Sequence, residues 1–195
     1  MQPTRRSILA GFLSAAALPA TGLHPAGAQA PPVLEPTPGC GDGDAPTVAQ
    51  TEGPYFKPEA PLRRDLAADA PNGDRITLAG FVLDTGCRPV PEALVQLWHA
   101  DETGAYDNAG YRLRGCQHAD DGGRWWFSTI VPARYPGRTR HYHVKVQKPG
   151  GRILTTQLYF PDDPLNRRDG LFDRRLVMRI TDTADGRFGR FDFVV

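Results

Sequence analysis

Residues 141–147 read HYHVKVQ, and this short stretch indicates both the fold class and a candidate site. Apolar and polar residues alternate, which is typical of a β-strand whose successive side chains point to opposite faces. The tyrosine and the two valines are expected to face a core, while His141, His143 and Lys145 point the other way. Histidines two residues apart on one face lie about 6.5–7 Å apart along the strand, so their rings can converge on one metal ion. The alternative is that this face is simply the solvated one.

Six further runs have strand character and complete the prediction of the fold. Turn signals rich in Gly, Pro and Asp separate them, and no helical period or internal repeat is present. Seven short strands predict an all-β fold, an antiparallel β-sandwich or barrel. The six runs are residues 76–83, 92–100, 124–131, 153–160, 175–182 and 191–195.

The composition agrees with one soluble domain built from strands and turns. The chain has 195 residues, 40% of them apolar and 23% charged, with 21 glycines and 19 prolines. This Gly and Pro content favours short strands over long helices. Residues 31–75 are irregular and rich in Pro and Gly, and they predict an N-terminal arm. Residues 76–195 are expected to form the β-sandwich.

Residues 1–30 are expected to be an export signal and not part of the fold. Paired arginines, Arg5 and Arg6, precede a short apolar run, and residues 28–30 read AQA, a small-residue cleavage site. The TRRS context favours the twin-arginine route, with periplasmic or extracellular localisation. An ordinary secretory signal and a retained membrane anchor are the alternatives. Loss of both arginines takes the formal net charge from +1 to −1, which excludes a basic surface for nucleic acid or anionic membrane.

Three cysteines, Cys40, Cys87 and Cys116, allow one disulfide and one leftover thiol in an oxidising compartment. The sequence does not say which two pair. Their spacing fits no zinc motif.

A metal site at the histidine pair needs further ligands. His99 ends a strand and His118 lies in a predicted turn, so both are interpreted as packing or surface residues. Tyrosine is the remaining donor, because a highly charged cation lowers the pKa of a phenol enough to bind it as phenolate. Tyr106 follows a glycine-containing loop and Tyr135 lies six residues before His141. Taken singly, either tyrosine is more often a packing residue.

Five segments in order carry a resemblance to a known family. They are TEGPYF (51–56), PVPEALVQLWHADETGAY (89–106), LRGCQHADDGGRWWFSTI (113–130), YPGRTRHYHVKV (135–146) and TTQLYFPDDP (155–164). Together they cover most of residues 51–164. The sequence resembles the intradiol ring-cleavage dioxygenases, in particular a small exported branch whose core is similar to protocatechuate 3,4-dioxygenase subunits.

The resemblance implies a β-sandwich enzyme with Fe(III) bound by Tyr106, Tyr135, His141 and His143. Tyr135 and His141 would be axial, Tyr106 and His143 equatorial, and hydroxide would complete a five-coordinate site. The implied reaction cleaves a catechol-type ring between its two hydroxyls with O₂ and gives a cis,cis-muconate-type dicarboxylate. No NAD, flavin or haem is implied. The sequence is compatible with a homo-oligomer.

Four more site residues follow from the resemblance. Arg138 matches an arginine over the substrate ring that stabilises developing anionic charge, and Gln157 matches a glutamine that orients the ring. Pro54 and Tyr55 match a segment that lines the substrate pocket. Tyr135 would take up a substrate proton.

Two differences from the larger enzymes bear on the substrate. The interval from Tyr135 to His141 is shorter, and Ala133-Arg134 replaces a small, glycine-bearing approach. Arg134, Arg138 and Arg140 lie close together in sequence, but the directions of their side chains are not given by the sequence. Substituted catechols, hydroxyquinol-like rings and lignin- or plant-derived phenols all remain open, and the three arginines would favour a carboxylated ring if they point into the pocket.

Two other readings of the chain are weighed. A secreted β-sandwich can sequester a metal, or bind aromatics or polysaccharide, without turnover. A different metal, such as copper, can also occupy a Tyr₂His₂ cage, whereas tyrosinates argue against zinc.

Overall fold

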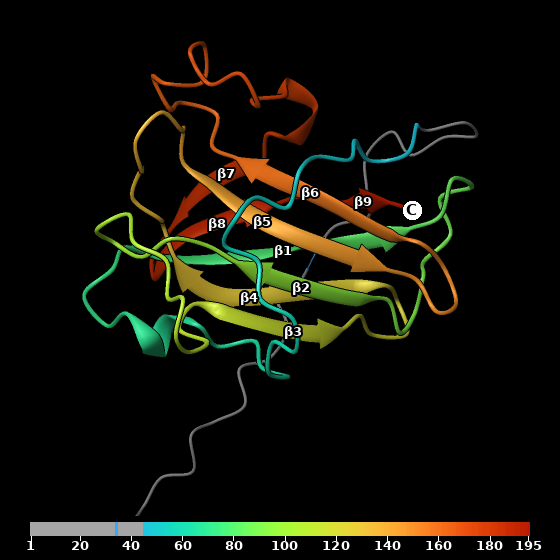
Figure 1. Ribbon diagram of the computed structural model, residues 1–195. Helices are drawn as coiled ribbons and strands as arrows, with labels where there is room; N and C mark the ends of the chain where they lie inside the picture. The colour runs from blue at the N-terminus through green and yellow to red at the C-terminus, as the bar shows by residue number, and fades with distance from the viewer. Residues whose placement is uncertain (1–33, 35–44) are drawn as a thin grey trace, which may run out of the picture. The chain divides into compact units, whose positions relative to one another are not determined.

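The computed structural model describes residue 34 and residues 45–195 (Figure 1). The predicted export signal and Cys40 lie outside the described residues, as does most of the first part of the predicted arm. In the described part of the chain, no helix is long and apolar enough to cross a membrane.

Nine strands form two stacked sheets, and the only helices among the described residues are the short 3₁₀ turns η1 (Ala67–Asp69) and η2 (Arg174–Leu176). The all-β prediction is confirmed. The strands are β1 (Arg75–Leu83), β2 (Leu94–Trp98), β3 (Arg114–His118), β4 (Arg124–Ile130), β5 (His141–Gln147), β6 (Ile153–Tyr159), β7 (Arg179–Thr183), β8 (Gly186–Arg190) and β9 (Phe193–Val194).

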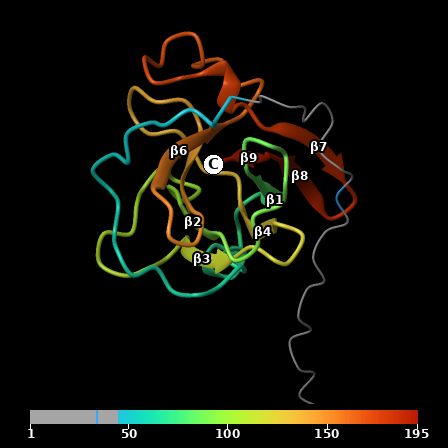
Figure 2. The ribbon, with the colours of Figure 1, turned by 90° about the vertical axis from the view of Figure 1, so that its right-hand side faces the viewer.

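The two sheets pair different parts of the chain. One has the order β3-β2-β5-β6 and is antiparallel throughout; the other has the order β4-β1-β8-β7, with β9 beside β1. In the second sheet β1 is antiparallel to β4 but parallel to β8 and β9. Figures 1 and 2 show the sheets as two layers. The predicted sandwich is therefore correct, with two parallel pairings that alternation of residues alone does not reveal.

The core fills the space between the sheets and explains the alternation in β5. Tyr142, Val144 and Val146 are fully buried there, against Leu78 of β1 and Phe127 of β4. These side chains come from every second position, as strand geometry requires. The intervening histidines consequently lie on the outer face of the β3-β2-β5-β6 sheet.

Two strands were not predicted, because their residues have little strand character. β3 reads RGCQH and β8 reads GRFGR. β3 forms because all five of its residues pair with β2, so His118 lies at a strand end and not in a turn. β8 lies between β1 and β7, and its Gly189 admits Leu78, whose Cδ2 would be 2.9 Å from an added Cβ. Tertiary pairing overrides weak local propensity in both strands.

The arm covers the outer face of the β3-β2-β5-β6 sheet, as Figures 1 and 2 show. The backbone N–H of Gln50 donates to Thr155 O, and Thr156 Oγ1 donates to Val48 O. Farther along, the Nε2 of Gln96 donates to Lys57 O. The arm thus crosses from β6 to β2 and passes over the two histidines.

Cys87 is disulfide-bonded, whereas Cys116 is a buried free thiol, so these two cysteines do not pair with each other.

Candidate metal centre

A row of cross-strand partners on the outer face of the sheet forms the base of the site. Arg114 of β3 pairs in register with Trp98 of β2, Trp98 with His143 of β5, and His143 with Gln157 of β6. All four side chains are almost fully buried. Tyr159 of β6 lies in the next row, opposite His141. The interpretation of this face as a solvated one is therefore wrong, because the arm and loops cover it.

The two histidines aim ring nitrogens at each other. His141 Nε2 and His143 Nε2 are 3.2 Å apart. His141 Nδ1 lies 2.7 Å from Thr139 O; a carbonyl only accepts, so Nδ1 carries the proton and Nε2 keeps its lone pair. Trp98 stacks on the His143 ring at 5.0 Å and fixes its plane. Packing thus presents both imidazoles to one point.

Two tyrosines from separate loops complete a ring of four side chains. Tyr106 comes from the β2–β3 connection and Tyr135 from the β4–β5 connection. Ring centroids lie 5.7 Å apart for Tyr106 and Tyr135, 5.5 Å for Tyr135 and His141, 4.8 Å for His141 and His143, and 6.0 Å for His143 and Tyr106. The structure therefore brings together all four residues predicted as ligands.

Asp101 shapes the loop that carries Tyr106. Its Oδ1 accepts from Thr103 N, Thr103 Oγ1 and Ala105 N, and its Oδ2 accepts from Arg112. Burial raises the pKa of this carboxyl, but these hydrogen bonds outweigh it and lower the pKa to about 2. Gly104 has φ +91°, and a Cβ there would lie 2.5 Å from Arg134 O. The DETG sequence is thus needed for the two tyrosine loops to approach each other.

Arg138 links Tyr135 of the four-residue ring to Gln157, the other predicted site residue on the sheet. Its Nη1 donates to Tyr135 Oη at 3.0 Å, its Nη2 to Gln157 Oε1 at 2.6 Å, and its Nε to Asp169 Oδ2 at 2.9 Å. Gln157 Nε2 donates in turn to Thr51 O of the arm. Arg138 and Gln157 therefore lie together at the site, and Asp169 is a partner that the sequence did not indicate.

Arg114 was also missed. It is buried, and its side chain donates to backbone carbonyls: Nη1 donates to Tyr55 O, and Nε and Nη2 donate to Asp107 O. It thereby holds the arm beside the Tyr106 loop. Arg114 lies opposite Trp98 on the outer face of the sheet. This position can be recognised in the sequence only once β3 is assigned as a strand.

The arm contributes Tyr55, whose ring stacks on Tyr106 at 4.3 Å and 12°. Pro54, predicted with it, is exposed. Gly53 has φ +72°, and a Cβ there would lie 3.2 Å from Cε1 of His143. Glycine thus lets the arm backbone approach the imidazole closely.

Burial keeps all four candidate donors neutral in the protein alone. It lowers the pKa of His141 to about 4, with a further contribution from Arg138, and lowers that of His143 well below its usual value. It raises the pKa of the Tyr106 phenol, as does the neighbouring Tyr135. Burial also raises the pKa of Tyr135, which Arg138 partly offsets. A bound multivalent cation would instead lower the pKa of both phenols and favour their phenolate forms.

The donor set fits a hard, highly charged metal ion. Within the described residues, no group of three or more His, Cys, Asp or Glu is able to hold a metal, so a site here must use phenols. The buried Tyr106 hydroxyl has no hydrogen-bond partner in the described part of the chain, which is costly unless it serves another purpose. Two nitrogens bound side by side to one ion at about 2.0–2.1 Å lie about 3 Å apart, close to the His141–His143 separation.

The other histidines have ordinary roles, as predicted. His99 is buried, with Nε2 2.6 Å from Thr129 Oγ1 and Nδ1 2.7 Å from Ala100 O. His118 is exposed at the end of β3.

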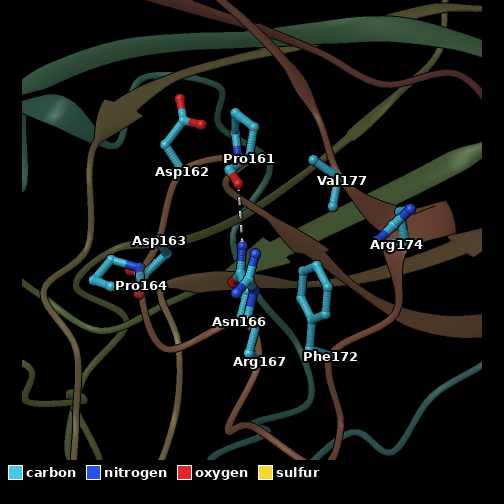
Figure 3. A pocket seen from close by; sticks show the side chains of 9 residues that line it. All are labelled: Pro161, Asp162, Asp163, Pro164, Asn166, Arg167, Phe172, Arg174 and Val177. Atoms are coloured by element: carbon cyan, nitrogen blue, oxygen red, sulfur yellow. Dashed lines mark hydrogen bonds between the residues drawn. The ribbon is translucent and has the colours of Figure 1, made fainter.

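A cavity of about 620 Å³ lies in the loop after β6. It is lined by Asp162, Asp163, Arg167, Phe172 and Arg174, among others (Figure 3). It contains no histidine or tyrosine, so it lacks the donors found at the ring.

The comparisons agree with this geometry. Residues 51–194 match the model of the family Dioxygenase_C, described as "Dioxygenase". The chain is 33% identical over 168 residues to a hydroxyquinol 1,2-dioxygenase of Corynebacterium glutamicum (72% of this chain, 56% of the relative). It is 35% identical over 135 residues to a protocatechuate 3,4-dioxygenase beta chain of Burkholderia cepacia (57% of each). The chain spans about half the length of these curated relatives.

Among solved structures, the dioxygenase domain of a dioxygenase–carbohydrate-binding protein fusion from Streptomyces sp. SirexAA-E superposes with a TM-score of 0.76 at 48% identity. The match covers 77% of this chain and 98% of that one. The family match extends over most of the described residues and includes all four members of the Tyr₂His₂ ring. The chain belongs to the intradiol ring-cleavage dioxygenase family.

Proposed function

We propose that the chain is a non-haem Fe(III) dioxygenase that cleaves a catechol-type ring between its two hydroxyls and gives a cis,cis-muconate-type dicarboxylate. One observation carries the proposal: Tyr106, Tyr135, His141 and His143 form a closed ring of side chains on one buried sheet face. The proposed partners are a catecholic small molecule and O₂. No candidate donor is missing, so a non-catalytic binding module is not favoured.

The four members of the ring would hold the metal. The chemistry that Fe(III) supplies when bound is Lewis-acid activation of the catechol toward O₂. His141 and His143 are suited to this because both are neutral and present ring nitrogens to one point. Tyr106 is suited because its buried hydroxyl has no hydrogen-bond partner in the described part of the chain.

As the tyrosinate that a bound Fe(III) would hold, Tyr135 would take a proton from a substrate hydroxyl. Its oxygen already accepts a hydrogen bond from Arg138 Nη1, an interaction that stabilises the phenolate form. Arg138 would also stabilise anionic charge that develops on the substrate, since its guanidinium is held in place before reaction. Gln157 holds the second arm of that guanidinium and thereby orients it. Tyr55 would form an aromatic wall beside Tyr106.

The first test is the visible spectrum of the purified, iron-reconstituted protein. Tyrosinate-to-iron charge transfer should give a burgundy colour that shifts when catechol is added without O₂. With O₂, one equivalent should be consumed per catechol, and both of its atoms should appear in the dicarboxylate. A protein that stays colourless after reconstitution would contradict the proposal.

We also propose export by the twin-arginine route, which is supported by Arg5, Arg6 and the AQA sequence at residues 28–30. This route carries folded proteins, so a metal can be loaded before export. Replacement of both arginines by lysine should leave the protein inside the producing cell. Continued export of that variant would favour the general secretory route.

A further inference from the structure

The arginines before β5 determine whether the site offers a positive charge to its substrate. Arg134, Arg138 and Arg140 lie within seven residues of each other, and a free guanidinium among them would attract a carboxylated ring. The structure gives the direction of each side chain.

Arg138 is the guanidinium at the four-residue ring, and its charge is matched. Its Nε forms an ion pair with Asp169, whose side chain is 1% exposed. Its two other nitrogens already donate to Tyr135 and Gln157. Three of its five N–H groups are therefore engaged within the protein, and Asp169 offsets its charge.

Arg134 and Arg140 are directed at a second buried carboxylate, that of Asp163. Arg134 Nε lies 3.0 and 2.9 Å from the two oxygens of Asp163, whose side chain is 0% exposed. Arg140 Nε is 3.9 Å from the same group, and Arg140 lines a cavity of about 370 Å³ with Ile180 and Arg187 of β7 and β8. Arg140 thus faces away from the histidines. It directly precedes His141, and adjacent residues of an extended strand point to opposite faces.

Three further cations around the site are also occupied. Lys145, two residues from His143 on the same face, lies 2.5 Å from Glu52 of the arm. Lys57 Nζ donates to three backbone carbonyls, those of residues 108–110. Arg114 likewise donates to backbone carbonyls and is buried beneath Tyr55 and Tyr106. Each of these three cations is thus already engaged within the protein.

We propose that the site takes an uncharged catechol ring and discriminates against a ring that carries a carboxylate. The inference rests on the proposed function, because that function places the catechol at the Tyr₂His₂ ring of side chains. A carboxylate that enters a largely buried site without a free cationic partner loses hydration that nothing replaces. The two buried aspartates are the residues that set this preference.

The test compares two ligands of nearly the same shape, the anionic 3,4-dihydroxybenzoate and the neutral 3,4-dihydroxybenzamide. Each is titrated into the full chain without O₂ in competition with catechol, and tryptophan fluorescence is recorded because Trp98 stacks on His143. Competition excludes a carboxylate bound elsewhere, for instance beside Arg167 and Arg174 in the cavity of Figure 3. The amide should bind at least tenfold more tightly than the carboxylate.

A matched pair of variants tests the cause. Asp163→Asn releases the charge of Arg134 and should reduce the preference for the amide several-fold. Asp162→Asn removes the same charge from the adjacent exposed residue, which has no arginine partner in the described part of the chain, and should leave the preference unchanged. Thermal melting of both variants shows whether Asp163→Asn is folded. If it is not, the ratio of the two ligands' affinities in the wild-type protein decides whether the charge preference exists.

The outcomes separate this proposal from the proposed function. Equal or tighter binding of the carboxylate overturns the charge preference even if both rings are cleaved. A preference for the amide without ring cleavage supports the charge preference and contradicts the dioxygenase activity. Failure of both compounds to displace catechol, or of catechol to bind, overturns the charge preference as well.

Discussion

Asp169 anchors Arg138 from 31 residues farther along the chain. Arg138 Nε lies 2.9 Å from Asp169 Oδ2, and the same oxygen accepts from Thr139 N. The guanidinium then reaches Tyr135 and Gln157 with its two other nitrogens. One carboxylate in the loop after β6 thus sets the position of a side chain in the loop before β5.

Replacing Asp169 by asparagine should therefore damage both the fold and the site. Removal of one partner of a buried ion pair costs about 3–5 kcal/mol, and we expect the lower end because Arg138 keeps 14% exposure. The kcat should fall more than KM rises, and the tyrosinate absorption should shift because Arg138 no longer holds Tyr135. Urea unfolding, steady-state kinetics and the visible spectrum measure these effects.

Asp173→Asn is the matched control for that variant. Asp173 pairs with Arg175, which is largely exposed, and such solvent-screened pairs contribute little to stability. It should leave the spectrum and kcat unchanged. An Asp169→Asn protein with wild-type kinetics and spectrum would contradict the positioning role.

Tyr106→Phe should remove the colour without destabilising the metal-free protein. The Tyr106 hydroxyl is buried and has no hydrogen-bond partner among the described residues, so its loss leaves metal-free stability unchanged or raises it by about 1 kcal/mol. Iron affinity should fall by roughly tenfold or more, since even outer partners of a metal ligand matter on that scale. Iron content, absorption and thermal melting are measured on the same preparation.

Tyr111→Phe serves as the control, because the Tyr111 hydroxyl donates to Pro58 O outside the ring of four. It should keep the colour. A coloured Tyr106→Phe protein would remove Tyr106 from the ligand set.

The ring residues were predictable because each lies in a motif with its own local signal. Alternation in HYHVKV places the histidines on one face, a glycine-containing loop precedes Tyr106, and Tyr135 directly precedes a Pro-Gly turn. Asp163 and Asp169 were not predictable in the same way. Each lies more than twenty residues from the arginine that it holds, and an isolated Asp in a Pro-rich loop is first read as a turn residue.

The same limit applies to the fold. β5 and β6 carry strong alternation and were predicted within one residue of their bounds, whereas β3 and β8 exist because neighbours pair with them. Arg114 could not be assigned to the site until β3 was known. Burial of the outer face also depends on the arm, whose contacts are nearly all non-local.

His99 makes the stability of the iron-free protein depend on pH. Burial lowers its pKa from 6.5 to about 4. Above pH 6.5 neither state binds the proton; below it the unfolded state binds the proton first, so stability falls as pH falls from 6.5 to about 4. At pH 5 the loss from His99 alone is about 2 kcal/mol.

Urea unfolding at pH 7.5 and 5.0 checks this. His99→Gln should retain more of its own pH 7.5 stability at pH 5.0 than the wild type does, although His141 and His143 still contribute. The same loss in both proteins would show that His99 is not the group responsible.

Gly53→Ala should weaken metal binding through the arm, which makes no bond to the metal itself. At φ +72° an alanine costs about 1–2 kcal/mol, and its Cβ would lie 3.2 Å from Cε1 of His143. Gly150→Ala has the same backbone problem at φ +67° but meets nothing within 4 Å, so it isolates the strain. Both variants should lose similar thermal stability when metal-free, whereas only Gly53→Ala should also lower iron affinity and shift the tyrosinate absorption, because the imidazole must move. Equal iron affinities in the two variants would mean that the arm covers His143 without determining its position.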